Sequence, residues 1–353
     1  MLLRSWVEVS LDRIAANYRA VKQTVGAVEV MPVVKADAYR HGASAVAHRL
    51  EEEGVRWLAV SNVTEGIRLR EDGLRSRILV MADTLEAGGD AWRSHRLTPV
   101  LHRLEDIGRL PAGISYHLKV DSGMSRLGVR AEPDAIIRAV RGTPIEGIMT
   151  HFASSANFSS TQTAEQIAAF EELASQLPVE YVHLSSTSPI HFGLRNTWRN
   201  LVRPGLALYG YLSASRGVPP EQLLKVTPAL TWKARILLVK DLPAGARIGY
   251  GGLCTADGPR RIAIVGAGYA DGLPHRLSNR GQVLAGGQVV PMLGAVSMDV
   301  TTIDISSVPH LQLGDEVTLL GAGLDAQAMA RAAGTIAYAV LCGINSRVSR
   351  VFV

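Results

Sequence analysis

The chain has 353 residues, of which 47% are hydrophobic and 20% charged, so it is long enough for two domains with buried cores. Its net charge of +5 comes from scattered arginines, without a run of five or six like charges or interleaved aromatic residues, and nucleic-acid binding is therefore not expected. Two cysteines, and ten histidines without ligand-type spacing, predict neither a disulfide framework nor a metal site.

Alternating helix and strand patterns fill the chain from residue 11 to about residue 210, which is typical of a parallel α/β architecture. Eight apolar strand candidates separated by amphipathic segments predict a TIM-type (β/α)8 barrel over residues 1–224. An open doubly wound sheet is the alternative, because periodicity does not reveal whether a sheet closes. The expected strands are Val30–Val34, Trp57–Val60, Ile78–Met81, Thr98–Leu101, Tyr116–Val120, Ile145–Thr150, Tyr181–Leu184 and Gly205–Tyr209, and the clearest helices are Leu11–Val25, Ser44–Glu53, Thr64–Glu71, Pro133–Val140 and Thr163–Leu177.

Short β-type runs punctuated by glycine and proline begin after about residue 225. They predict a separate, mostly antiparallel β domain over residues 225–353, which residues 1–9 could also join. Ser213–Pro220 is the expected connector. The expected strands are Ala229–Val239, Arg261–Val265, Gln282–Leu284, Val296–Ile305, Glu316–Leu320 and Arg347–Val353, with one helix at Ala326–Ala333.

Lys35 stands at the end of the first apolar strand and is one of only six lysines beside 31 arginines. The carboxyl ends of the strands surround the active site in a parallel barrel. Desolvation there lowers the pKa of an ammonium group and prepares the amine to form a Schiff base. The simpler alternative is a structural lysine at the barrel rim, paired with Asp37.

A second candidate lies in the β domain, where Gly266-Ala-Gly268-Tyr269 follows an apolar strand. A dinucleotide-binding loop would need a third glycine where Asp271 stands, and the next residues do not start a helix. The segment therefore predicts a glycine-hinged turn that directs Tyr269 outward.

Together, the segments Val33–Gly42 (VVKADAYRHG) and Gly268–Gly272 (GYADG) resemble the two catalytic signatures of alanine racemases. The resemblance covers nearly the whole chain. It implies an N-terminal barrel, a C-terminal β domain, the cofactor pyridoxal 5'-phosphate (PLP) and a homodimer with shared active sites. The implied reaction interconverts L-alanine and D-alanine, for cell-wall peptidoglycan or for D/L-alanine metabolism.

The resemblance also assigns the catalytic groups. Lys35 is expected to hold PLP and to act as one base, and Tyr269 of the partner subunit is expected to be the other. Racemisation needs two bases because a proton leaves one face of Cα and returns to the opposite face. Arg126 and His151 match supporting residues, although on residue type alone either could be an ordinary rim residue.

Further residues match positions that bind the cofactor or the substrate. Arg203 corresponds to the arginine that donates to the pyridine nitrogen of PLP; an arginine only donates, which leaves that nitrogen unprotonated and favours racemisation over transamination. Lys119 corresponds to a lysine that is often carbamylated, and as a carbamate it would hold Arg126. The expected phosphate contacts are Tyr39, Ser188, Gly205 and Leu206, and the expected partner-chain contacts of the substrate carboxylate are Met298 and Asp299.

Several positions depart from the family pattern. Arg40 replaces a glycine, Ala156-Asn157 replaces an acidic pair, and Ala295 replaces an arginine in the substrate entryway. Losing both charges together avoids an unpaired charge in a narrow channel. Ser346 stands where many relatives have a tyrosine, and a smaller, more polar wall could admit a hydroxyl. Serine, or a broader range of amino acids, is therefore the alternative substrate.

Two other function classes are compatible with a barrel lysine. A single-domain PLP-binding carrier protein would lack the β domain and Tyr269, and a decarboxylase of the same fold would need no tyrosine base.

The start of the chain lacks the apolar core of a signal peptide, and no apolar run reaches about 18 residues. We therefore expect a cytoplasmic enzyme that acts on a small amino acid, with neither nucleic-acid nor membrane contact.

Overall fold

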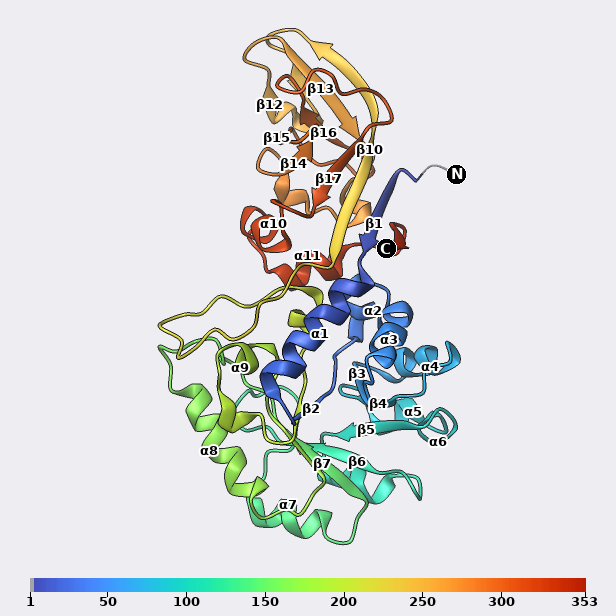
Figure 1. Cartoon of the computed structure of the whole chain (residues 1–353), viewed down its shortest axis with the longest axis vertical. Helices are drawn as coiled ribbons and strands as arrows, with labels where there is room; N and C mark the ends of the chain where they lie inside the picture. Colours follow the sequence, from blue (N-terminus) through green and yellow to red (C-terminus); the bar gives the residue numbers. More distant parts are fainter. Residues whose placement is uncertain (1–2) are drawn as a thin grey trace. The chain divides into compact units, whose positions relative to one another are not determined.

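The computed structural model describes residues 3–353 and divides them into two compact units (Figure 1). The barrel unit comprises residues 12–38 and 43–227. The β unit comprises residues 3–11, 39–42 and 228–353. The segment 39–42 therefore belongs to a different unit from Lys35, although only a few residues separate them in the chain.

Eight parallel strands form a closed ring in the barrel unit. Strands β3 to β8 pair in chain order, and β2 pairs with β9. The ring closes because Val33 bridges to Ala59 on β3, and because the Arg203 N–H beyond β9 donates to Ser185 O beyond β8 at 2.8 Å. This closure confirms the predicted barrel over the open sheet. The strands are β2 (Glu29–Val30), β3 (Trp57–Val60), β4 (Arg77–Val80), β5 (Leu97–Leu101), β6 (Tyr116–Lys119), β7 (Ile145–Met149), β8 (Tyr181–His183) and β9 (Leu201–Val202).

The helices of the barrel unit lie outside this ring (Figure 1). In α1 the buried residues Ile14, Tyr18, Val21 and Val25 recur at helical spacing and form the face that packs inward. The sequence predicted α1 and α7 at the residues where they occur. The helices are α1 (Leu11–Val25), α3 (Ala43–Glu52), α4 (Val63–Glu71), α5 (Leu85–Gly88), α6 (Ala91–Ser94), α7 (Pro133–Val140), α8 (Gln162–Ala174) and α9 (Thr187–His191).

The predicted eighth strand, Gly205–Tyr209, is wrong. The eighth strand is β9, and Leu206–Tyr209 forms a 3-10 turn, η3. All of these residues are buried, so the apolar run has no alternation that would separate a strand from a helical turn. The Ala207 N–H donates to the Thr187 hydroxyl instead of a neighbouring strand.

The sheet of the β unit also closes on itself. Its order is β13-β16-β15-β14-β17-β10, and the long strand β10 pairs back onto β13. The first half of β10 pairs with β17 and β1, and from Ile236 onward β10 pairs with β13, with a bulge between Ile236 and Leu238. The predicted, mostly antiparallel β domain is confirmed. The strands are β1 (Ser5–Val9), β10 (Leu230–Leu242), β11 (Arg247–Ile248), β12 (Cys254–Thr255), β13 (Arg260–Val265), β14 (Gln282–Ala285), β15 (Gln288–Leu293), β16 (Thr301–Asp304), β17 (Glu316–Leu320) and β18 (Ser349–Phe352).

Two helices belong to the β unit, α10 (Ala326–Ala333) and α11 (Ala337–Gly343). Asp325 begins α10 by accepting a hydrogen bond from Ala328 N at 2.7 Å, and Gly334 ends it with a φ of +65°. The sequence predicted α10 at these residues but not α11. No helix within residues 3–353 is both long and apolar enough to cross a membrane.

Candidate active site

The expected site residues of the barrel unit lie where its strands end. Lys35 follows β2, Lys119 is the last residue of β6, His151 comes two residues after β7, and Arg203 follows β9. Arg126 lies in the loop after β6. Because the carboxyl ends of parallel strands share one edge of a barrel, the topology brings these five side chains to the same end.

Lys35 begins α2 (Lys35–Arg40), a left-handed helical turn. Residues 36–40 all have φ between +53° and +67°, although none is glycine. This conformation costs roughly 1–2 kcal/mol per residue, and such strain is typical of functional sites. Within the barrel unit, Ala36 N donates to Glu65 Oε1 at 2.7 Å, and Ala43 N donates to Asp37 Oδ1 at 2.8 Å. The carboxylate of Asp37 therefore stabilises the turn through the main chain.

Positive charges converge on His151. Burial is the main cause that lowers its pKa to about 3, followed by the charges of Arg203, Lys119, Arg126 and Lys35 in that order. The ring is therefore neutral at pH 7. Burial also lowers the pKa of Lys119 to about 8, with further lowering by Arg203, Arg126 and Lys35. These four cations therefore act on one region of the barrel unit.

The loop that carries Arg126 is fixed by Asp121. One oxygen of this carboxylate accepts the N–H groups of Gly123 at 3.2 Å and of Met124 and Ser125 at 2.9 Å. Burial would raise the pKa of Asp121, but these hydrogen bonds to the ionised form lower it. The carboxylate is therefore ionised at pH 7 and orders the loop up to the residue before Arg126.

Arg203 is buried, and both terminal nitrogens of its guanidinium are occupied. One donates to His183 O at 2.6 Å and to His183 Nδ1 at 2.9 Å, and the other donates to Thr150 O at 2.7 Å and Leu184 O at 3.2 Å. Burial lowers its pKa to about 9, so the group stays charged at pH 7. Nε has no hydrogen-bond partner in the part of the chain that the structure describes, and one donor therefore remains for a ligand.

Behind Arg203, a row of polar side chains crosses the barrel. Arg203 only donates, so His183 Nδ1 accepts and His183 Nε2 carries the proton that it donates to His117 Nδ1 at 2.8 Å. Burial lowers the pKa of His117 to about 3 and that of His183 well below its ordinary value, which keeps both rings neutral. His117 Nε2 lies 4.0 Å from a Glu146 oxygen, and Arg77 binds both oxygens of that carboxylate.

Three of the four expected phosphate contacts, all except Tyr39, lie in the turns after the seventh and eighth barrel strands, where TIM barrels commonly bind phosphate. Ser188 is in α9, and Gly205 and Leu206 begin η3. The hydroxyl of Thr187 ties the two turns together, because it accepts from Gly205 N and from Ala207 N at 3.2 Å each. The Gly205 N–H, expected to contact a phosphate, thus also has a partner within the protein.

Tyr269 lies in the β unit at the start of a 3-10 turn, η5 (Tyr269–Asp271). Its main-chain N–H donates to Ser297 O at 2.9 Å, and a Cβ on Gly268 would lie 2.3 Å from the carbonyl oxygens of both Ser297 and Met298. Only glycine allows this approach. The Tyr269 side chain is 44% exposed. The turn therefore fixes the main chain of Tyr269 and presents its side chain to the outside of the unit.

The carboxylate of Asp271 stabilises this turn through a hydrogen bond to its main chain. This buried carboxylate accepts from Gly268 N at 2.9 Å and pairs with Arg347 Nε at 2.9 Å. Arg347 also binds Asp299 at 2.7 Å. The expected substrate residues Met298 and Asp299 are thereby linked to the Tyr269 turn.

Tyr39 is also in the β unit, where its ring lies 5.9 Å from that of Tyr338. Burial raises the pKa of its hydroxyl, with smaller effects of Tyr338 and Cys342. The neighbouring Arg40 donates from Nε to Cys342 O at 3.3 Å. The larger residue at position 40 is thus held against α11.

Comparisons with known proteins agree with this arrangement. The family model "Alanine racemase, N-terminal domain" matches residues 9–213, and "Alanine racemase, C-terminal domain" matches residues 229–352. The alanine racemase of Halothermothrix orenii is 37% identical and covers 99% of this chain and 96% of its own length. The chain belongs to the alanine racemase family. A solved alanine racemase of Clostridium difficile 630 has a TM-score of 0.91 at 32% identity, covering 100% of this chain and 96% of that one.

The family is PLP-dependent, and this chain is accordingly a PLP-dependent racemase, an isomerase. An alanine racemase from Bartonella henselae, 27% identical with a TM-score of 0.90 and full coverage of both chains, is described with covalently bound pyridoxal phosphate. The residues of this chain fit that cofactor. They offer cations for a phosphate and a carboxylate, and a buried guanidinium with one unused donor for a ring nitrogen. Membership of the family also removes the carrier protein and the decarboxylase as alternatives.

Sequence reasoning missed Thr187, the histidine pair behind Arg203, and the anchoring role of Asp271. His117 and Lys119 are two residues apart on β6 and therefore face the same side, which is a readable signal. Thr187 directly precedes the predicted phosphate contact Ser188, but nothing in the sequence indicates that its hydroxyl accepts a hydrogen bond from Gly205 N, beyond the next strand.

Proposed function

We propose that this protein interconverts L-alanine and D-alanine by a two-base mechanism, in a homodimer whose active sites combine residues of both subunits. Relatives with the name alanine racemase extend over 99% of the chain, which supports alanine as substrate. The observation that carries the mechanism is the Gly268 turn, which fixes the main chain of an exposed tyrosine. D-alanine would serve cell-wall peptidoglycan or D/L-alanine metabolism. A cytoplasmic location stays a prediction.

PLP, when bound, would supply an electron sink that acidifies the Cα–H bond of the amino acid. Lys35 would hold the cofactor and exchange a proton with one face of Cα, and Tyr269 of the partner subunit would exchange a proton with the other face. The reverse reaction exchanges their roles. Arg203 would donate from Nε to the pyridine nitrogen, and since its other donors are fixed by carbonyl groups it would not release a proton there.

The substrate carboxylate would bind to Arg126 and to main-chain groups of the partner subunit. In the β unit the Met298 carbonyl already accepts from Ala270 N at 3.0 Å. The N–H of Met298 is therefore the group left to donate to an anion. Arg347 occupies one oxygen of Asp299, so the side chain of Asp299 would act by positioning this segment.

Serine, or a broader range of amino acids, is the alternative substrate. It is favoured by the uncharged Ala156 and Ala295 and by the small Ser346, whose side chain is exposed. Incubation with a panel of L-amino acids in deuterated water would decide, with Cα exchange and D-enantiomer formation as readouts. Exchange with alanine alone would support the first substrate, and exchange with no amino acid would refute the proposed function.

Two variants test the separate roles of the bases. Tyr269→Phe should lose racemisation by at least the 10²–10⁴-fold typical of a positioned acid or base, yet retain the bound cofactor. Lys35→Ala should also lose the covalent attachment, which borohydride reduction and peptide mapping would detect. Near-normal rates of Tyr269→Phe in both directions, or an adduct on Lys119, would contradict these assignments.

Mixed dimers test whether the site is shared. A Lys35→Ala chain paired with a Tyr269→Phe chain has one site with both defects and one site with neither. Subunit exchange between the two inactive variants should restore up to about a quarter of the wild-type activity, since random pairing makes half of the dimers mixed and half of their sites intact. No recovery, with exchange verified by native mass spectrometry, would place both bases in one chain.

A further inference from the structure

A cleft of about 470 Å³ opens at the amino-terminal ends of barrel strands β4, β5 and β6. It therefore lies at the end of the barrel opposite Lys35. Five of its lining residues are arginines from three segments of the chain: Arg70 on α4, Arg75 and Arg77 around the start of β4, and Arg93 and Arg96 before β5.

Among these arginines, only Arg77 has a carboxylate partner in the described residues. Glu146 binds it through both oxygens. Arg93 donates to the Ala112 carbonyl at 2.7 Å, and the guanidinium groups of Arg75 and Arg96 have no hydrogen-bond or ion-pair partner within residues 3–353. Four arginines of the cleft thus lack a direct carboxylate partner, although the carboxylate of Glu51 lies beside them and accepts from Arg75 N at 2.7 Å and from Ser76 N at 2.5 Å.

Arg70 is the fixed member of the cluster. Its guanidinium donates to four main-chain carbonyls, including His95 O at 2.9 Å and Ser76 O at 3.0 Å. These bonds hold the charge in place without neutralising it. Burial lowers the pKa of Arg70, the charge of Arg96 lowers it further, and the charge of Glu51 partly counteracts this lowering. Because the side chain of Arg70 is already ordered, an anion that binds near its charge would not have to immobilise it.

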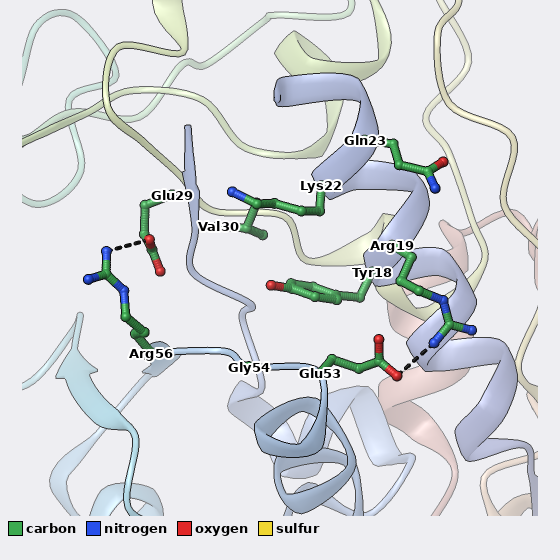
Figure 2. Close-up of a pocket in the computed structure, with 9 residues that line it drawn as sticks. All are labelled: Tyr18, Arg19, Lys22, Gln23, Glu29, Val30, Glu53, Gly54 and Arg56. Atoms are coloured by element: carbon green, nitrogen blue, oxygen red, sulfur yellow. Dashed lines mark hydrogen bonds and ion pairs between the residues drawn. The ribbon is translucent and has the colours of Figure 1, made fainter. Parts of the chain in front are cut away.

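In a second pocket of about 270 Å³ at the same end of the barrel, carboxylates pair with the arginines (Figure 2). It contains Arg19, Lys22 and Arg56, but Arg19 pairs with Glu53 at 2.6 Å and Arg56 pairs with Glu29 at 2.6 Å. The arginine cleft has the same residue types on the same scaffold, but among its five arginines only Arg77 pairs with a carboxylate within the described residues. Its positive charge is therefore a local property and does not follow from the net charge of the chain.

We propose that this cleft binds an anion with several phosphate groups, that is, an oligophosphate. A guanidinium group can donate two parallel hydrogen bonds to the oxygens of one phosphate. About four positive charges match the negative charge of a chain of two or three phosphates. A nucleic-acid strand fits less well, because Trp92, the aromatic residue of the lining, is only 2% exposed and offers no face on which a base could stack. The phosphate chain could be free or part of a nucleotide.

Isothermal titration calorimetry of the PLP-loaded enzyme with inorganic tripolyphosphate tests this site, with ATP as the second arm. One binding event per chain is expected, and it should weaken as salt increases. Equal affinities would assign the site to the phosphate chain alone, and tighter binding of ATP would assign it to a nucleotide. No saturable binding of either probe would overturn the proposal.

Two matched variants separate the cleft from general attraction to a basic protein. Arg93→Gln with Arg96→Gln should weaken tripolyphosphate binding at least tenfold, because both side chains are exposed in the cleft. Arg138→Gln with Arg141→Gln removes the same charge from exposed positions at the end of α7 and should change the affinity less than twofold. Equal effects of the two pairs, or displacement of the probe by alanine, would refute a specific site in the cleft.

Discussion

Acid should destabilise this protein through histidines that the barrel buries as neutral rings. His117 and His183 are fully buried; burial lowers the pKa of His117 to about 3 and that of His183 well below its ordinary value, whereas an unfolded histidine titrates near 6.5. Below pH 6.5 the unfolded chain therefore binds protons that the folded chain does not. Stability is fully present above pH 6.5 and is lost as the pH falls toward 3.

The expected magnitude follows from this difference. At pH 5 the solution pH lies about 1.5 units below the pKa of an unfolded histidine. At about 1.36 kcal/mol per unit, each buried histidine then lowers the unfolding free energy by roughly 2 kcal/mol relative to pH 8. His117→Asn removes one titrating ring but keeps an acceptor near Nδ1 for the proton of His183. The variant should therefore lose about 2 kcal/mol less than the wild type between pH 8 and pH 5.

Urea unfolding followed by fluorescence at the two pH values, at one protein concentration, measures this difference. His310→Asn removes an exposed ring and is the matched control, which should follow the wild-type change. The comparison concerns the pH dependence, so a uniform loss of stability in His117→Asn does not affect it. Equal changes for the wild type and His117→Asn would refute the assignment of His117 as a buried neutral ring.

Two further changes test the β unit and the entryway. Gly268→Ala would place a Cβ 2.3 Å from the Ser297 carbonyl oxygen. The variant should lose about 1–3 kcal/mol of unfolding free energy, measured by thermal or urea unfolding, and should have a lower kcat because Tyr269 is displaced. An unchanged kcat would show that the turn does not position the tyrosine. Ala156→Asp with Ala295→Arg should narrow the substrate range toward alanine, measured as the ratio of kcat/KM for serine and alanine; an unchanged ratio would show that these positions do not determine selectivity.

The sequence predicted the barrel because strand and helix periods differ where one face is buried. Leu11–Val25 shows this, since its apolar residues follow the helical period and the structure has α1 at the same residues. The prediction failed at Gly205–Tyr209, where every side chain is buried and no period remains. It also missed the left-handed turn at residues 36–40, because alanine, aspartate and tyrosine do not mark positive φ as glycine does.

The candidate site shows a similar limit. Residues at strand ends, such as Lys35 and Lys119, can be located from the strand pattern alone, because topology brings strand ends together. Contacts such as that between Asp271 and Arg347 join residues 76 positions apart, and no local pattern encodes them. The motif resemblance predicts the reacting groups, whereas the hydrogen bonds and ion pairs that hold their segments in place are found only in the structure.

The charges around Lys35 explain why this barrel end suits an anionic cofactor and substrate. Lys119, Arg126, Arg203 and Lys35 all disfavour a proton on His151, and Asp121 is the carboxylate that counteracts their effect on Lys119. A bound phosphate and carboxylate would relieve this repulsion, and by the same Coulomb interaction they would raise the pKa of Lys119 above its value of about 8. With a pKa of about 8, a fraction of Lys119 is the neutral amine at pH 7, which is the form that carbamylation requires. A carbamate formed there from the amine and carbon dioxide would place a negative charge beside Arg126 for as long as it persists, independently of whether substrate is bound.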